Sequence, residues 1–209
     1  MKFYDCTTAP SPRRVRIFMA EKGIEIDTVQ IDLANGEQFS EEFKAINPLC
    51  EVPLLVLEDG TSISQISAIC RYLEEIYPDN PLLGRTPVER AVVESSNQQL
   101  QMNGFAAGAE AFRNATPGFK NRAMPGPHNY SQIPELAERG QQRLDNLFSD
   151  LEAHLANSQY IVGDYYSIAD ISALCVVDFA KWVKKRIPED YSNLQRWYDQ
   201  VSSRPSAKA

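Results

Sequence analysis

The residue types that most often carry out chemistry are sparse in this sequence. The four cysteines are scattered along the chain, at Cys6, Cys50, Cys70 and Cys175. They form no C-x-x-C motif, and none is paired with a histidine at metal-ligand spacing. Only His128 and His154 could complete a zinc site or a Ser-His-Asp triad, so we expect neither. Reduced thiols in the cytoplasm are the simplest interpretation of this cysteine usage.

The charge balance argues against a nucleic-acid partner. The 28 acidic and 21 basic residues give a formal net charge of -7, whereas phosphate binding needs clustered Lys and Arg. Two local basic clusters, residues 13–16 and 184–186, are interpreted as solvated helix faces. The first ten residues lack a long apolar stretch, and no apolar run reaches membrane-spanning length, so we expect no signal peptide and no membrane partner.

Residues 1–77 alternate between the two kinds of secondary structure. Apolar alternation and short apolar runs predict strands at 2–5, 24–33, 52–57 and 61–63. Helical spacing predicts helices at 12–22, 40–45 and 66–77. Gly23 is a natural end for the first helix, and residues 58–60 read as a hairpin turn. The predicted order is therefore β-α-β-α-β-β-α.

Residues 78–209 contain no convincing strand. Residues 78–86 have the composition of a linker, and residues 87–209 are predicted to be all helical. The expected helices are 87–115, 135–155, 167–184 and 191–202. Gly104 and Gly108 are the expected weak points of the first of these, and a Pro- and Gly-rich loop precedes the second.

One local signal in the second half is strong. Ser167 precedes a helix and Asp170 follows three residues later, the spacing of a capping box. Tyr166 and Ile171 are placed to form a hydrophobic staple over the same turn. This is a device for folding rather than for catalysis.

Four segments together resemble the cytosolic glutathione transferase superfamily. They are APSPRRVRIFMAEKGI, INPLCEVPLL, EDGTSISQISAICRYLEEIYP and YIVGDYYSIADIS. The resemblance implies a thioredoxin-like α/β domain followed by an all-α helical bundle, in a homodimer with its active site between the domains. It implies domain bounds of 1–77 for glutathione binding, 78–86 for the linker and 87–209 for the electrophile pocket.

The resemblance also assigns residues to glutathione. Val52-Pro53 matches a cis-proline loop whose Val52 main chain pairs with the cysteinyl part of the tripeptide, as in strand addition. Gln38 stands where the family contacts the glycyl carboxylate. Gln65 and Ile66 stand where the family holds the γ-glutamyl end at a helix N-terminus.

Ile66 departs from the family pattern, because a serine is common there. Losing its hydroxyl would cost roughly 1.5–3 kcal/mol of binding. In one interpretation the main-chain amides of Ile66 and Ser67, together with Gln65, suffice. In the other, glutathione binds weakly and the fold has another task. We favour the first.

The group that stabilises the glutathione thiolate is expected at the end of the first strand or the start of the first helix. The candidates there are Tyr4, Cys6, Thr7, Thr8 and Ser11. Ser11 matches best, because SPRRVRIF resembles the serine-type pattern and a helix N-terminus adds positive potential. Its alternative role is that of an N-cap followed by proline. His128 and Ser131, holding a water near the sulfur, are remoter alternatives.

The helical half is expected to supply the electrophile pocket, from Met102, Phe105, Phe112 and Tyr166, with Phe119 as a further candidate. The favoured function is a glutathione S-transferase that conjugates the thiolate to a small electrophile, in a cytoplasmic detoxification role. Two alternatives stay open: a non-catalytic binding module, and a glutathione-dependent disulfide or peroxide reductase. No metal is expected.

Overall fold

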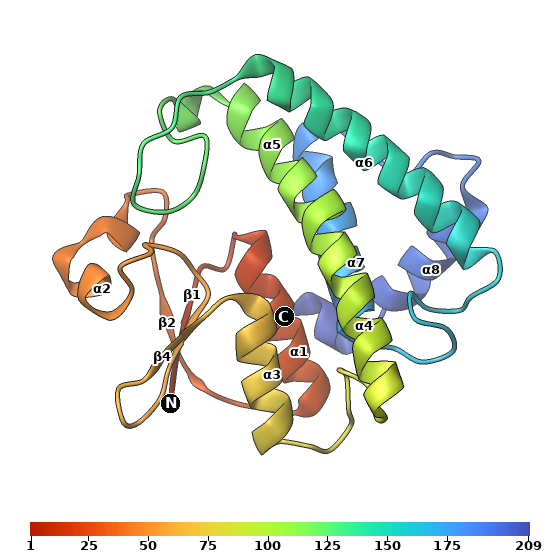
Figure 1. Ribbon diagram of the computed structural model, residues 1–209, viewed down its shortest axis with the longest axis horizontal. Coiled ribbons are helices and arrows are strands. Elements are labelled where there is room, and N and C mark those ends of the chain that lie inside the picture. The colour runs from red at the N-terminus through yellow and green to blue at the C-terminus, as the bar shows by residue number, and fades with distance from the viewer. The chain divides into compact units, whose positions relative to one another are not determined.

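A computed structural model of the chain describes all residues from 1 to 209, in two compact units. The first unit contains residues 1–80, the short segment 125–128 and residue 209, and the second contains residues 81–124 and 129–208. Figure 1 labels their helices and strands. No helix combines the length and the apolar character that crossing a lipid bilayer requires.

The first unit is built on a mixed four-stranded sheet with strand order β2-β1-β3-β4. Its elements are β1 (Lys2–Asp5), α1 (Pro10–Lys22), β2 (Asp27–Gln30), the 3-10 turn η1 (Glu37–Phe39), α2 (Glu41–Ile46), β3 (Leu54–Val56), β4 (Ser62–Ser64) and α3 (Ile66–Ile76). β1 pairs in parallel with β2 and antiparallel with β3, and β3 pairs antiparallel with β4. The predicted order β-α-β-α-β-β-α and the thioredoxin-like fold class are confirmed.

The alternation of side chains along β1 gives the sheet two apolar faces. Phe3 and its partner Leu55 are fully buried on one face. The helices α1 and α3 of the same unit pack side by side (Figure 1). Tyr4 and its partner Leu54 point to the other face, where Phe43 of α2 closes the core. The ring of Phe43 meets that of Tyr4 edge-on at 6.0 Å.

Two details of the first helix differ from the sequence expectation. The helix begins at Pro10 rather than at residue 12, with Ala9 as its N-cap. The basic cluster 13–16 is not a solvated face, because Arg14 is only 2% exposed and Arg16 forms an ion pair with buried Asp5. A basic cluster therefore does not predict a solvated face where a buried carboxylate can pair with it.

The second unit is helical. Its elements are α4 (Pro87–Leu100), the π-helical turn η2 (Gln101–Phe105), α5 (Ala106–Ala115), the 3-10 turn η3 (Pro117–Phe119), α6 (Pro134–Leu155), α7 (Ile168–Ala180), the 3-10 turn η4 (Lys181–Val183), α8 (Ser192–Ser202) and the 3-10 turn η5 (Pro205–Lys208). Every residue of α7 except Asp178 is buried, so this helix is the core of the unit. The all-helical prediction for the second half is confirmed.

Glycines let the helices of this unit approach closely. A Cβ on Gly104 would lie 2.6 Å from Cγ2 of Val176, and one on Gly140 would lie 2.5 Å from the carbonyl oxygen of Ala107. Gly104 is therefore a contact point between η2 and α7. The expected weak point is present, because the α-helix gives way to the π-helical turn η2 around Gly104. The close packing on Val176 explains why the residue there is a glycine.

The predicted capping box is present at the start of α7. The N–H of Ser167 donates to Oδ2 of Asp170 at 3.0 Å. Oγ of Ser167 accepts from the N–H of Ala169 at 3.2 Å. Asp170 is completely buried, and this desolvation raises the pKa of its carboxyl to about 6.

Candidate functional site

Several of the residues assigned to glutathione lie at one end of the central strands β1, β3 and β4. Leu54 pairs with Ser64 on one side and with Tyr4 on the other. Since β3 runs antiparallel to both neighbours, it starts where β1 and β4 end. Val52 and Pro53 precede β3 at this end of the sheet, and Gln65 follows β4 there. The register thus brings Val52, Pro53 and Gln65 together.

The main chain of Val52 is available for hydrogen bonding at this end of the sheet. The Val52-Pro53 bond is cis, as the resemblance predicts. Neither the N–H nor the C=O of Val52 forms a hydrogen bond in the structure, although Leu54 two residues later is paired in the ladder. A free donor and a free acceptor on one residue, just before the central strand β3, can pair with the main chain of an extended peptide.

Gln65 places the N-terminus of α3 beside Val52. Gln65 is the N-cap of α3, with φ of 72° and ψ of 133° and no capping bond from its side chain. A non-glycine residue at positive φ is uncommon and costs of order 1–3 kcal/mol, and such strain concentrates at ligand sites. The main-chain amides of Ile66, Ser67 and Ala68 lie in the first turn, where no earlier carbonyl of the helix can accept from them. These amides can receive a carboxylate.

Ser11 is the second residue of α1 and not its N-cap, so the capping role considered from the sequence is wrong. Pro10 and Pro12 on either side have no N–H. In the first three helical positions, Ser11 therefore carries the one main-chain donor as well as a hydroxyl. Its half-buried side chain makes no hydrogen bond in the structure. The N-terminus of α1 thus offers its donors through a single residue.

A hydrogen-bond network fixes the loop that leads to Ser11. Oδ1 of Asp5 accepts from Nη1 of Arg16 at 2.6 Å, and Oδ2 accepts from Nε2 of Gln30 at 2.6 Å. Oε1 of Gln30 in turn accepts from the N–H of Thr7 at 2.9 Å. Sequence reasoning missed Asp5, Arg16 and Gln30. A carboxylate in phase with the buried Phe3, before an Arg-rich helix, is the signal that could have found them.

Gln38 lies in the turn η1 before α2. Its side-chain oxygen Oε1 is buried and has no hydrogen-bond partner. Buried amide groups are nearly always paired, so an orphaned oxygen indicates a partner that the chain does not supply. The side chain of Gln38 is therefore a group that a ligand can engage.

The short segment 125–128 belongs to the first unit although its flanking residues belong to the second. Gly126 is buried with φ of +97°, and a Cβ on it would lie 3.6 Å from Oε1 of Glu51 and 3.6 Å from the carbonyl of Leu49. The segment thus packs on the loop that leads into Val52. It carries exposed His128, whereas Ser131 belongs to the second unit.

The four side chains expected at an electrophile pocket have different surroundings in the second unit. Phe105 is 5% exposed and stacks on Phe179 at 6.3 Å, and Phe112 meets the same ring edge-on at 6.0 Å. Met102 is 59% exposed on η2. Tyr166 belongs to another cluster, with the ring of Tyr160 at 5.9 Å and the guanidinium of Arg204 at 4.1 Å. Phe179 brings Phe105 and Phe112 together, and their contact with an electrophile stays a prediction.

Comparison with known proteins identifies the family. Residues 8–76 match the profile "Glutathione S-transferase, N-terminal domain" and residues 105–205 match "Glutathione S-transferase, C-terminal domain". Glutathione S-transferase 2 of Saccharomyces cerevisiae is 33% identical over all of this chain and 88% of its own length. This chain belongs to the glutathione S-transferase family.

Solved structures agree over the whole chain. The crystal structure of Gtt2 from Saccharomyces cerevisiae superposes with a TM-score of 0.90 at 33% identity, covering 100% of this chain and 99% of the other. A glutathione S-transferase domain-containing protein from Marinobacter aquaeolei VT8 gives a TM-score of 0.90 at 34% identity, with 99% of each chain covered. The fold of both units is thus the one that the family shares.

Proposed function

We propose that this chain is a glutathione S-transferase that binds glutathione along the main chain of Val52 and conjugates its thiolate to a small electrophile. Family membership and the full-length similarity to a glutathione S-transferase support the enzyme class and glutathione as co-substrate. The observation that carries the binding mode is the unpaired main chain of Val52 beside the free amides of α3.

The tripeptide would bind as a short added strand. The cysteinyl N–H and C=O pair with the main chain of Val52, and the γ-glutamyl carboxylate lies at the amides of Ile66 and Ser67. The Nε2–H of Gln38 donates to the glycyl carboxylate, whereas its unpaired Oε1 is an acceptor and needs a donor elsewhere on the ligand. In this arrangement Ile66 contributes through its N–H, and its apolar side chain is tolerated because the hydroxyl of a serine adds only one donor to an existing set.

Ser11 is proposed to stabilise the thiolate. Its O–H donates to the sulfur anion, which lowers the thiol pKa because a hydrogen bond to the charged form favours that form. The thiol proton leaves to solvent. The sulfur lone pair then forms a bond to the electrophilic carbon, and the leaving group departs with its bonding electrons.

A glutathione analogue tests the binding mode. Methylation of the cysteinyl nitrogen removes the N–H that would donate to the carbonyl of Val52, and we expect calorimetry to show at least tenfold weaker binding. S-methylglutathione keeps this N–H but cannot form the thiolate that Ser11 is proposed to stabilise, so it should lose less affinity than the N-methylated analogue. Equal binding of the N-methylated analogue would overturn the proposed strand addition.

Binding and activity assays on the same protein distinguish the alternative functions. Tight glutathione binding with conjugation of an aryl halide supports the transferase. No binding at millimolar glutathione would favour a non-catalytic module. Turnover of a peroxide or mixed disulfide with no conjugation would favour a reductase.

A homodimer is part of the proposal. Val88 and Val92 lie one turn apart on α4, with 73% and 47% of their surfaces exposed. Two valines on one face of a helix support a self-complementary contact with a second copy of this chain. Sedimentation of the protein and of a Val88→Glu/Val92→Glu variant tests this, and the variant should sediment as a monomer.

The proposed location is the cytoplasm and the proposed role is detoxification of small electrophiles. All four cysteines are free thiols, which supports a reducing compartment. Fractionation of the cells that express the protein tests the location.

A further inference from the structure

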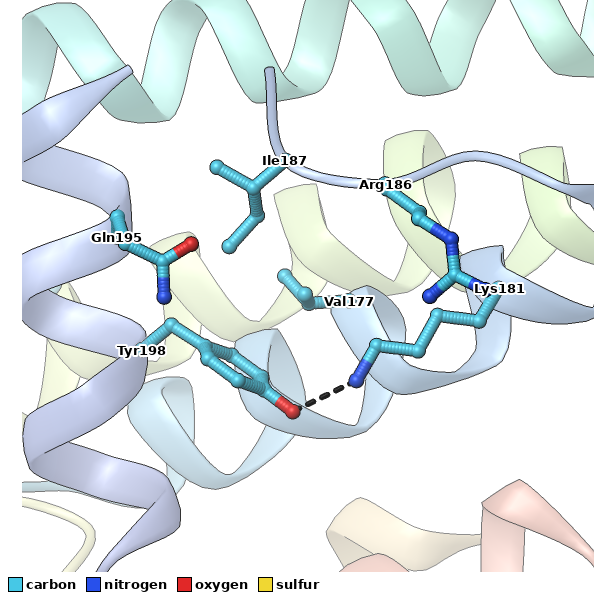
Figure 2. A pocket seen from close by; sticks show the side chains of 6 residues that line it. All are labelled: Val177, Lys181, Arg186, Ile187, Gln195 and Tyr198. Carbon is cyan, nitrogen blue, oxygen red and sulfur yellow. Dashed lines mark hydrogen bonds between the residues drawn. The ribbon is translucent and has the colours of Figure 1, made fainter. Parts of the chain in front are cut away.

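The second unit contains a pocket whose residues have no part in the proposed glutathione site. Its volume is about 210 Å³, and it lies between α7, α8 and the loop that joins them. The lining residues are Val177, Lys181, Arg186, Ile187, Gln195 and Tyr198 (Figure 2). Two of the six are cationic and two are aliphatic.

Lys181 is held in place by its neighbours. Its Nζ donates to Oδ1 of Asp178 at 2.7 Å and to the hydroxyl oxygen of Tyr198 at 2.7 Å. The Tyr198 hydroxyl donates to the same Asp178 oxygen at 2.7 Å. Partial burial by itself would lower the pKa of Lys181, but the bonds to Asp178 and Tyr198 outweigh it and raise that pKa. Lys181 is therefore charged and fixed at neutral pH.

Arg186 is the second cation, and it has no partner. It forms no hydrogen bond and no ion pair in the structure, whereas its neighbour Lys185 is paired with Asp145. Figure 2 shows its guanidinium directed toward the Lys181 side chain, across the pocket from Tyr198. The charges of Asp178 and Lys181 offset each other, so Arg186 leaves the pocket with one uncompensated positive charge.

The opposite part of the lining is apolar. Val177 comes from the buried helix α7, and Ile187 directly follows Arg186 in the loop (Figure 2). A ligand that fits must combine one negative charge with a small apolar body. A guanidinium binds carboxylates through two parallel hydrogen bonds.

We propose that this pocket binds a small organic monocarboxylate, with the carboxylate at Arg186 and the apolar body against Val177 and Ile187. The volume limits the ligand to about the size of a benzoate or a short-chain acid, since drug-sized ligands occupy roughly 300–1,000 Å³. The basic cluster 184–186 was expected on a solvated helix face, but it lies in the loop after η4. In this proposal the loop contributes a ligand-binding residue.

Calorimetric titration with benzoate tests the proposal, with neutral benzamide as the matched ligand. We expect benzoate to bind and benzamide to bind at least tenfold more weakly. Arg186→Gln should weaken benzoate binding at least tenfold, because a hydrogen-bonded charge is lost. Lys184→Gln is the matched control variant: it removes an exposed cation of the same cluster that does not line the pocket, and binding should change less than twofold.

Several results would overturn the proposal. They are equal binding of benzoate and benzamide, equal losses in the two variants, and tighter binding of inorganic phosphate than of benzoate. Unchanged NMR signals of the Gln195 side-chain amide at roughly 10 mM benzoate would do the same, since that excludes a millimolar site. Shifts of the Gln195 side-chain amide in NMR spectra during the titration locate the ligand, and unchanged circular dichroism of Arg186→Gln excludes misfolding.

Discussion

The indole N–H of Trp197 donates to Oδ1 of Asp170 at 2.9 Å, and both residues are completely buried. This bond joins the middle of α8 to the first turn of α7. The same carboxylate also accepts from the main-chain N–H of Ile161 at 3.0 Å and of Ser167 at 3.0 Å. The capping box is therefore the centre of a buried network that fixes two helices and the loop before them.

Removing the Trp197 donor should destabilise the protein. In Trp197→Phe the Asp170 carboxylate loses one of its hydrogen bonds inside the core, which costs about 1.5–3 kcal/mol, plus the effect of the smaller ring. Urea unfolding measures this loss. Trp182→Phe is the control, because Trp182 is 49% exposed, and its effect should be clearly smaller. Equal effects of the two substitutions would contradict the role of the bond.

The free energy of unfolding should depend on pH because Asp170 has a raised pKa in the folded protein. Its pKa is about 6 in the folded protein against an ordinary 3.8, so the folded state takes up a proton between these values that the unfolded state does not. The contribution of this group to the free energy of unfolding therefore grows as pH falls from about 6 to about 4, by up to about 3 kcal/mol.

Asp170→Asn removes that titration. The difference in the free energy of unfolding between the wild type and Asp170→Asn should be larger at low pH than at neutral pH. If the variant does not fold, the NMR titration of the Asp170 carboxyl carbon in the wild type measures the same pKa. A value near 4 would refute the raised pKa.

Ser11→Ala should raise the pKa of the enzyme-bound glutathione thiol and slow conjugation at neutral pH by at least tenfold, because the hydroxyl bonded to the thiolate is lost. Ser11→Thr keeps the hydroxyl and should retain most of the rate. The ultraviolet absorbance of bound thiolate, followed against pH, measures the pKa directly. An unaltered pKa in Ser11→Ala would leave Ser11 with no part in thiolate formation.

Ile66→Ser restores a hydroxyl at the N-terminus of α3. We expect about tenfold tighter glutathione binding, from one additional hydrogen bond to the γ-glutamyl carboxylate. Ile66→Ala shortens the side chain without adding a donor and should leave the affinity within about twofold. If both variants bind more tightly to the same extent, the gain comes from removing the isoleucine and not from the hydroxyl.

Gln65→Gly should separate stability from binding. Glycine adopts φ of 72° without the penalty that glutamine meets there, so the free energy of unfolding should rise by about 1 kcal/mol. Glutathione binding should weaken because the Gln65 side chain is lost. A variant that is less stable than the wild type in urea would show that the backbone at residue 65 is not strained.

Much of the fold could be predicted because the periodicity of apolar residues is set by local geometry. β1 was expected at 2–5 and is found at Lys2–Asp5, and the mixed order of strands and helices followed the pattern. β2 is shorter than expected, at Asp27–Gln30, because alternation reports which side chains are buried and not how far the ladder extends. The π-helical turn η2 was missed because a small change of helical period is invisible in a single sequence.

The candidate site could be predicted only in part, because several of its features depend on tertiary contacts. The cis bond before Pro53 followed from a motif. The partners of Asp5 come from α1 and from the end of β2, and the carboxylate that pairs with Arg16 lies 11 residues before it. Such pairings arise when strands and helices pack, so neither spacing nor composition indicates them.

The return of residues 125–128 to the first unit has a consequence for dissecting the protein. The polypeptide passes from one unit to the other more than once, so the halves are interleaved along the gene and not simply consecutive. A truncation after residue 80 would remove the segment 125–128, whose Gly126 packs near the main chain of Leu49 and the side chain of Glu51. An excised thioredoxin-like half would therefore be a poor surrogate in glutathione-affinity measurements, and a circularly permuted chain that keeps every residue would be a better one.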